Sequence, residues 1–338
     1  MKKRFIAFLL SLVLIVVLVQ AYFFLQKPPS SEAIYQTIEI EPGATFLAVA
    51  RLLKQEGLII SPVSFRFLGK ITKNESKIKP GEYRLHRAMR PGEILETLVR
   101  GDVLKHRVVI PEGTAIREIG KILEGAGLMT AEVFNQTARN QELIQRLGFE
   151  GESLEGYLFP DTYHFTKQTP PEQFIEMMTK QFQSVYDDTF AAQAEKLGMT
   201  RREVVTLASI IEKETGAPSE RALISGVFHN RLKRKMRLQS DPTVIFSLAD
   251  FDGDIRSKDL QNDSPYNTYR VAGLPPGPIT NPGREAIFAA LFPAEVDYLF
   301  FVSKNNGEHV FSETLREHNA AVRKYQLKEN DEAMCRAC

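Results

Sequence analysis

The chain has 338 residues, which corresponds to about two folded domains at roughly 100–200 residues each. Charged residues make up 25% of it, as in an ordinary water-exposed protein body. Lys and Arg number 43 and Asp and Glu 42, so the net charge is only +1. Such a balance creates no overall field that would attract nucleic acid, and this class of partner is excluded.

The N-terminus carries a basic cluster followed by a long apolar run. Lys2, Lys3 and Arg4 precede residues 5–25, which are interrupted only by a few polar side chains. About 20 apolar residues suffice to cross a bilayer as a helix. Because the basic cluster precedes the run, the N-terminus should stay in the cytoplasm and the body should be exported. We therefore predict a membrane anchor over residues 1–27.

A cleaved signal peptide is the alternative interpretation of this segment. Val19-Gln20-Ala21 is a passable cleavage site. However, Tyr22-Phe23-Phe24-Leu25 prolongs the apolar run beyond that site, which favours a retained anchor. Residues 28–33, which begin with Pro28-Pro29-Ser30-Ser31, then resemble a short linker, because Pro and Ser discourage both helix and strand.

Residues 34–150 contain a weak internal repeat. A strand is predicted over residues 37–40, a helix over residues 46–58 with Gly57 at its end, and the same order returns with a strand at 108–110 and a helix from about 116. Gly43 matches Gly113 and Gly57 matches Gly127 at one offset. Another strand (81–85) and helix (91–99) lie between the two copies. The sequence therefore predicts a small α/β domain, which could be either a spacer or a glycan-contacting module.

Residues 151–328 differ in character and form the second predicted domain, of the α+β class. Aromatic and Pro-rich loops separate long helices. Near the end, strands at 298–303 and 309–312 are joined through Asn305-Asn306-Gly307, and Asn-Gly is a strong hairpin signal. A final helix is predicted over about residues 313–326. The tail 329–338 holds both cysteines, Cys335 and Cys338, which are interpreted as having no catalytic role.

The sequence lacks the common catalytic and cofactor motifs. It contains no HExxH, no GxSxG and no phosphate-binding P-loop, and its six histidines are scattered. No metal site and no cofactor are therefore predicted.

One segment, residues 201–216 (R-R-E-V-V-T-L-A-S-I-I-E-K-E-T-G), could carry acid catalysis. At helical periodicity Leu207 and Ile211 belong to an apolar face, and Glu214 falls near the edge of that face. Glu212 is rotated further away. Partial desolvation of a carboxyl group raises its pKa toward neutrality, as a general acid requires. The spacing alone favours the simpler interpretation of a solvated helix end with ordinary charges.

Further along the chain lie side chains of the kind that bind sugars. Flat aromatic faces and short polar groups recognise pyranose rings and their hydroxyls. The candidates of this kind for a substrate groove are Asn230, Gln239, Asp241, Thr243, Tyr266, Asn267 and Tyr269.

Taken together, several segments resemble the endolytic murein transglycosylase (MltG-like) family. They are L-A-S-I-I-E-K-E-T, S-E-R, V-F-H-N-R-L, M-R-L-Q-S-D-P-T-V, Y-N-T-Y, G-L-P-P-G-P-I-T-N-P-G and, upstream, E-G-Y-L-F-P-D-T-Y. Their order and spacing match over about residues 150–325. His229 in V-F-H-N-R is a mild departure from the family pattern.

The resemblance implies a lyase of the cytoplasmic (inner) membrane, single-pass, with its catalytic body on the outer, periplasmic side. Such a lyase cuts nascent peptidoglycan strands between N-acetylmuramic acid and N-acetylglucosamine, leaves 1,6-anhydro ends and so terminates strand elongation. The resemblance places the catalytic glutamate at Glu214, with Glu212 as second choice. It also implies a LysM-like small domain and the peptidoglycan synthases as partners. A hydrolase that pairs Glu214 with Asp241, and a non-enzymatic glycan-binding envelope protein, remain alternatives.

Overall fold

The computed structural model describes residues 10–13, 15, 16, 20, 22, 25–248 and 251–327. Within these residues, no helix has both the length and the hydrophobicity needed to cross a membrane. Most of the predicted anchor, and the tail with both cysteines, lie outside them. The chain forms two compact units: Met1–Arg107 with His164–Thr169, and Val108–Tyr163 with Pro170–Cys338.

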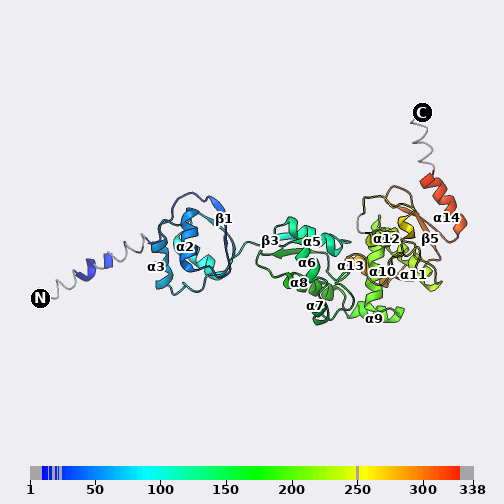
Figure 1. The fold of residues 1–338 in the computed structure, drawn as a ribbon, viewed down its shortest axis with the longest axis horizontal. Helices are drawn as coiled ribbons and strands as arrows, with labels where there is room; N and C mark the ends of the chain where they lie inside the picture. Colours follow the sequence, from blue (N-terminus) through cyan, green and yellow to red (C-terminus); the bar gives the residue numbers. More distant parts are fainter. Residues whose placement is uncertain are drawn as a thin grey trace, which may run out of the picture. The chain divides into compact units, whose positions relative to one another are not determined.

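The first unit is built around a strand pair and three helices (Figure 1). Strand β1 (Tyr35–Ile40) pairs antiparallel with β2 (Gly81–His86). Helices α2 (Phe46–Gln55), α3 (Pro62–Ile71) and α4 (Pro91–Arg100) complete it. Alternate residues of β1, Ile38 and Ile40, join the inner faces of these helices in one apolar core.

The segment His164–Thr169 belongs to the first unit although it lies far along the chain. The ammonium of Lys167 is 3.0 Å from a carboxylate oxygen of Glu82 and 3.5 Å from one of Glu39. The carboxylate of Glu82 also bonds the ring of His106. Desolvation raises the pKa of Glu82, but His106 and Lys167 together lower it by more, so the pKa lies below its ordinary value. Strand β3 (His106–Val109) pairs with β4 (Thr162–Phe165) where the division between the units falls.

The second unit is mostly helical. Its elements are α5 (Ile116–Gly125), α6 (Ala131–Thr137), α7 (Gln141–Arg146), α8 (Pro171–Val185), α9 (Asp188–Leu197), α10 (Arg201–Glu214), α11 (Arg221–Lys233), α12 (Asp241–Ser247), α13 (Arg284–Leu291), the hairpin β5 (Phe300–Ser303) and β6 (His309–Ser312), and α14 (Leu315–Val322). Short 3-10 turns at Pro218–Glu220 and Asp259–Gln261 and a π-helical turn, Arg323–Leu327, accompany them. Mixed helices with small two-stranded sheets confirm the α+β class in outline.

The two predicted copies of the internal repeat have similar local geometry. Helices α2 and α5 have the same length and lie at the offset that the glycines indicated. Gly43, Gly57, Gly113 and Gly127 all have positive φ, between 67° and 81°, a region that favours glycine. The two copies nevertheless belong to different compact units.

The division of the chain at 107/108 differs from the predicted boundary at 150/151. The reason lies in the N-terminus of α5, which is bound to later parts of the second unit. The backbone N–H of Ile116 donates to both carboxylate oxygens of Glu155 at 3.1 Å, and the side chain of Asn281 donates to the carbonyl of Thr114 at 2.8 Å. These buried bonds attach residues 108–150 to the second unit.

Helix α10 lies at the centre of the second unit. Thr200 and Glu203 form a reciprocal capping box at its start. From residue 204 to residue 211 every side chain is buried, including Thr206 and Ser209. The prediction of one apolar face was therefore too narrow, because α9, α11, α12 and α13 all pack on this helix.

Candidate active site

Glu214 is the last residue of α10 and lies in a cleft of about 540 Å³. Its side chain is half-buried, and its Oε1 accepts a hydrogen bond of 2.6 Å from the hydroxyl of Ser240. Ser240 immediately precedes α12. The other residues that line the cleft are Arg231, Leu238, Gln239, Asp241, Tyr269, Phe300, Phe301, Val302, Ser303, His309, Leu315, His318, Asn319, Val322 and Gln326.

The surroundings of Glu214 favour its protonated form. Burial raises the pKa of this carboxyl to about 7, and the neighbouring charge of Asp241 acts in the same direction. The Ser240 hydroxyl and the positive charge of Arg231 act against this rise. A carboxylate at the C-terminal end of a helix is also disfavoured by the partial negative charge there. At neutral pH, Glu214 can therefore hold a proton and also release it.

Arg231 is a buried residue in the lining of the cleft. It is only 6% exposed, and its guanidinium donates to the backbone carbonyls of Leu299 and Leu238 at 2.7 and 2.6 Å. It also lies over the ring of Phe300, 5.4 Å from the centroid. These bonds connect Arg231 to the loop before α12 and to the residue that precedes β5. Its charge compensates that of Glu214 when the carboxyl group ionises.

Glu212 has a different environment, although it is two residues away. Its Oε2 accepts a 2.9 Å bond from the backbone N–H of Gly283, at the start of α13, and its Oε1 is 3.6 Å from the guanidinium of Arg221. Burial raises its pKa, and the charge of Glu112 adds to this effect. Glu212 does not line the cleft that contains Glu214. Its contacts connect α10, α11 and α13.

Three of the predicted groove residues meet Glu214 in the cleft: Gln239, Asp241 and Tyr269. The Tyr269 hydroxyl donates to Asp241 at 2.6 Å, and burial next to this carboxylate raises the pKa of the phenol. Gln239 has φ of +50°, unusual for a non-glycine residue, and its N–H donates to the carbonyl of Thr268 at 3.1 Å. Gln239 and Glu214 line the same cleft.

The other four predicted groove residues lie elsewhere in the second unit. The Thr243 hydroxyl donates to the carbonyl of Ser240 at 2.6 Å, and the buried Asn267 amide donates to the carbonyls of residues 260 and 262. The Asn230 amide donates to the carbonyls of residues 296 and 298. Tyr266 lines a separate cavity of about 500 Å³ with Arg202 and residues 276–278. These polar groups thus stabilise the loops around the site.

Two histidines, His309 and His318, also line the cleft, and neither was among the predicted site residues. Nδ1 of His309 is 2.8 Å from Glu220, whose carboxylate also accepts the His309 backbone N–H. The ring of His318 stacks on Phe300 at 5.2 Å, and burial together with the charge of Arg231 lowers its pKa. Both histidines come from the C-terminal hairpin and helix, far in sequence from Glu214. Ser240, which binds Glu214, was also not among the predicted site residues, although it directly precedes the predicted Asp241.

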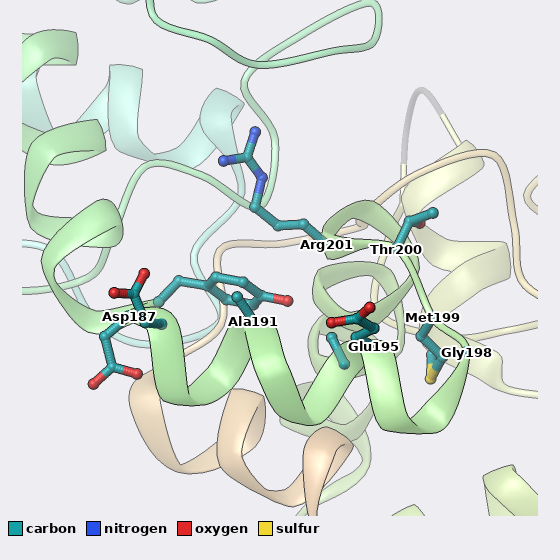
Figure 2. Close-up of a pocket in the computed structure, with 10 residues that line it drawn as sticks. Asp187, Ala191, Glu195, Gly198, Met199, Thr200 and Arg201 are labelled. Carbon is teal, nitrogen blue, oxygen red and sulfur yellow. The ribbon is translucent and has the colours of Figure 1, made fainter.

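Another cavity, of about 620 Å³, lies along α9 (Figure 2). None of the predicted catalytic or groove residues lines it. Two of the polar side chains that line it, Asp187 and Arg201, form hydrogen bonds with nearby backbone groups. Asp187 accepts the N–H groups of Thr189 and Phe190 at the start of the helix, and Arg201 donates to the carbonyl of Gly148. Among the residues with described positions, no three His, Cys, Asp or Glu side chains are grouped as a metal site would require.

The chain is similar to a known protein family, to curated proteins and to a solved structure. The model of the YceG-like family matches residues 38–324. An endolytic murein transglycosylase of Bacillus subtilis (strain 168) is 35% identical over 310 residues, covering 87% of this chain and 86% of that protein. One of Streptococcus pneumoniae (strain ATCC BAA-255 / R6) is 29% identical over 323 residues, covering 85% of this chain but only 58% of that protein. The crystal structure of a yceG-like protein, lmo1499, from Listeria monocytogenes superposes with a TM-score of 0.60 at 34% identity, covering 85% of this chain and 98% of that one.

Proposed function

The chain belongs to the YceG-like family, and from this premise we propose that it is a peptidoglycan lytic transglycosylase with Glu214 as its catalytic acid. The observation that supports this assignment most directly is the position of Glu214. It is a carboxyl group with a pKa near 7, half-buried in a cleft that is large enough for sugar rings. Two relatives named endolytic murein transglycosylases supply the substrate class.

The proposed reaction needs one carboxyl group. Protonated Glu214 donates its proton to the glycosidic oxygen as the bond to C1 of N-acetylmuramic acid breaks and an oxocarbenium-like state forms. The C6 hydroxyl of the same sugar then attacks C1, and the Glu214 carboxylate accepts the proton of that hydroxyl. The products are a 1,6-anhydro end and a free N-acetylglucosamine hydroxyl, and no water is consumed. Well-placed acid–base catalysis contributes typically about 10²–10⁴-fold.

The remaining cleft residues would position the strand. Ser240 holds one oxygen of Glu214, so the other oxygen faces the substrate. Asp241, Gln239 and Tyr269 offer acceptors, an amide and an aromatic ring to sugar hydroxyls and faces. Cleavage within nascent strands would end their elongation. The N-terminal apolar run would hold the enzyme at the outer face of the cytoplasmic membrane, beside the peptidoglycan synthases.

The decisive experiment compares full-length wild type with Glu214→Gln on fresh, uncrosslinked glycan strands, with mass analysis of the products. We expect 1,6-anhydro ends from the wild type and none from the variant. Equal degradation by both proteins would show that Glu214 is not the acid.

Two other functions predict different products. A hydrolase that pairs Glu214 with Asp241 would use water and leave reducing ends, since ordinary glycosidases work with two carboxyl groups. A glycan-binding envelope protein would leave the strands intact.

A further inference from the structure

Helix α3 of the first unit exposes a row of large apolar side chains. Val63, Phe67 and Ile71 are spaced four residues apart and are 77%, 53% and 54% exposed. Residues at this spacing lie on one face of a helix. The opposite face, with Phe65 and Leu68, is buried in the core of the unit. The helix is therefore apolar on two sides, and the core accounts for only one of them.

Basic residues surround the exposed row. Arg66 and Lys70 lie on the same exposed face, and Lys73, Lys77 and Lys79 follow the helix, all of them exposed. Within residues 59–79 the only acidic side chain is Glu75, which pairs with Arg66 at 3.1 Å. A helix face that combines Phe and aliphatic side chains with flanking cations is typical of helices that lie in the headgroup region of a membrane. Long Lys side chains can cross such a layer and keep their charge in water.

The start of α3 lies beside the end of the N-terminal apolar run. Leu25 and Lys27 line a small recess together with residues 59–61 and Pro91. The side-chain oxygen of Gln26 accepts the backbone N–H of Gly92 at 3.1 Å, which ties the same segment to the first turn of α4. A chain that leaves a bilayer near residue 27 therefore brings the first turn of α3 close to the lipid headgroups.

From these observations we infer that α3 is a second membrane contact. Its exposed face, defined by Val63, Phe67 and Ile71 and flanked by Arg66 and Lys70, lies on an anionic lipid surface. The inference rests on the membrane anchor proposed above and goes beyond it. The anchor alone would only tether the first unit, whereas a seated α3 would also fix its orientation and its height above the bilayer. A second copy of the chain and another protein are the alternative occupants of this face.

The test uses the full-length chain in lipid vesicles, with the two native cysteines replaced (Cys335→Ser, Cys338→Ser). An environment-sensitive fluorophore is attached at Phe67→Cys or, as the matched control, at Thr37→Cys. Thr37 is exposed on β1 and alternates with Ile38 and Ile40, which face the helices, so it points away from α3. Vesicles contain anionic lipids whose acyl chains are brominated and quench nearby fluorophores. Flotation with the vesicles shows that the anchor is inserted.

We expect severalfold stronger quenching at position 67 than at position 37. The double variant Lys70→Glu, Lys73→Glu should weaken quenching at position 67 on anionic vesicles and leave it unchanged on zwitterionic ones. Flotation with equal quenching at both positions would overturn the inference while leaving the anchor intact. Crosslinking of two chains through position 67 without quenching would also overturn it, in favour of a second copy. Catalytic activity, measured separately, reports on the proposed function alone.

Discussion

Two glutamates of the second unit, Glu214 and Glu155, both have raised pKa values but differ in their hydrogen-bond partners. Burial raises the pKa of both, to about 7 and about 8. Glu155 is 6% exposed, and its oxygens accept the Ile116 N–H and the side-chain amide of Asn281 at 3.0 Å. Glu214 receives one hydroxyl bond and borders a cleft. Glu155 also borders a cavity, of about 500 Å³, so neither a raised pKa nor a place in a cavity wall identifies the acid. The two groups differ in their hydrogen bonds, because both oxygens of Glu155 accept N–H donors whereas Glu214 accepts a single hydroxyl.

The largest expected effect tests this contrast at the cleft. Glu214→Gln should lower glycan-cleaving activity by about 10²–10⁴-fold or more, because the proton donor is lost. Thermal unfolding should show a folded protein, since Gln keeps the size and the acceptor for Ser240. Glu212→Gln is the matched control and should retain most activity, because that carboxylate is used by Gly283 and Arg221. Comparable loss in both variants would contradict the contrast.

The next effect concerns stability and lies with Glu155. Glu155→Ala would remove the acceptor of the buried Ile116 N–H and one of the two acceptors of the Asn281 amide, at about 1–3 kcal/mol for each unsatisfied N–H. Denaturant unfolding should therefore show a loss of several kcal/mol. Glu155→Gln, which mimics the protonated acid and still offers an acceptor, should lose much less. If Ala and Gln variants were equally stable, the proposed structural role would be wrong.

The pH dependence of stability should carry the signature of Glu155. Its pKa is about 8 in the folded protein and near 4.5 in the unfolded chain, so the folded state holds the proton more tightly. Its contribution is fully present below pH 4.5 and is lost as the pH rises through 8, at no more than about 1.4 kcal/mol for each pH unit. Unfolding free energies between pH 4.5 and 8 should flatten in Glu155→Gln. An unchanged slope would rule out this origin.

The smallest effects should appear in the neighbours of Glu214 and should have opposite signs. Ser240→Ala removes a donor that favours the carboxylate, so the pKa of Glu214 should rise and the alkaline limb of activity should move to higher pH. Asp241→Asn removes a nearby negative charge and should move the limb to lower pH. Changes at a fixed pH should stay within about tenfold, which corresponds to one pKa unit. Shifts in the same direction would contradict this electrostatic assignment.

The sequence predicted the main elements but only part of the site. Helical periodicity and glycine stops located α2, α5 and α10, and the Asn-Gly turn located the last hairpin. The preference for Glu214 over Glu212 came from the edge of an apolar face and from the family resemblance, yet residues 204–211 of α10 are buried on all sides. What distinguishes the two carboxylates is their tertiary partners, which periodicity cannot reveal.

Polar side chains near the site were the least predictable. Thr243 and Asn267 have the chemistry of sugar-binding groups, but nearby backbone carbonyls use them. His309 lines the cleft, and its ring and backbone N–H bind Glu220, which lies 89 positions earlier in the chain. Whether such a side chain binds the substrate or a backbone carbonyl depends on which of them lies nearby in the folded protein. That proximity cannot be derived from the order of residues in the sequence.

The return of residues 164–169 to the first unit has a consequence for how this protein can be cut or recombined. Lys167 supplies a cation to Glu82 and Glu39, so the first unit is not a continuous stretch of sequence. A protease that nicks the chain after Arg107 should release no free fragment under native conditions. A gene fusion that includes only residues 28–107 would lack residues 164–169, and with them the cation that pairs with Glu82 and Glu39. Exchange of the first unit between two proteins would therefore require both of its segments.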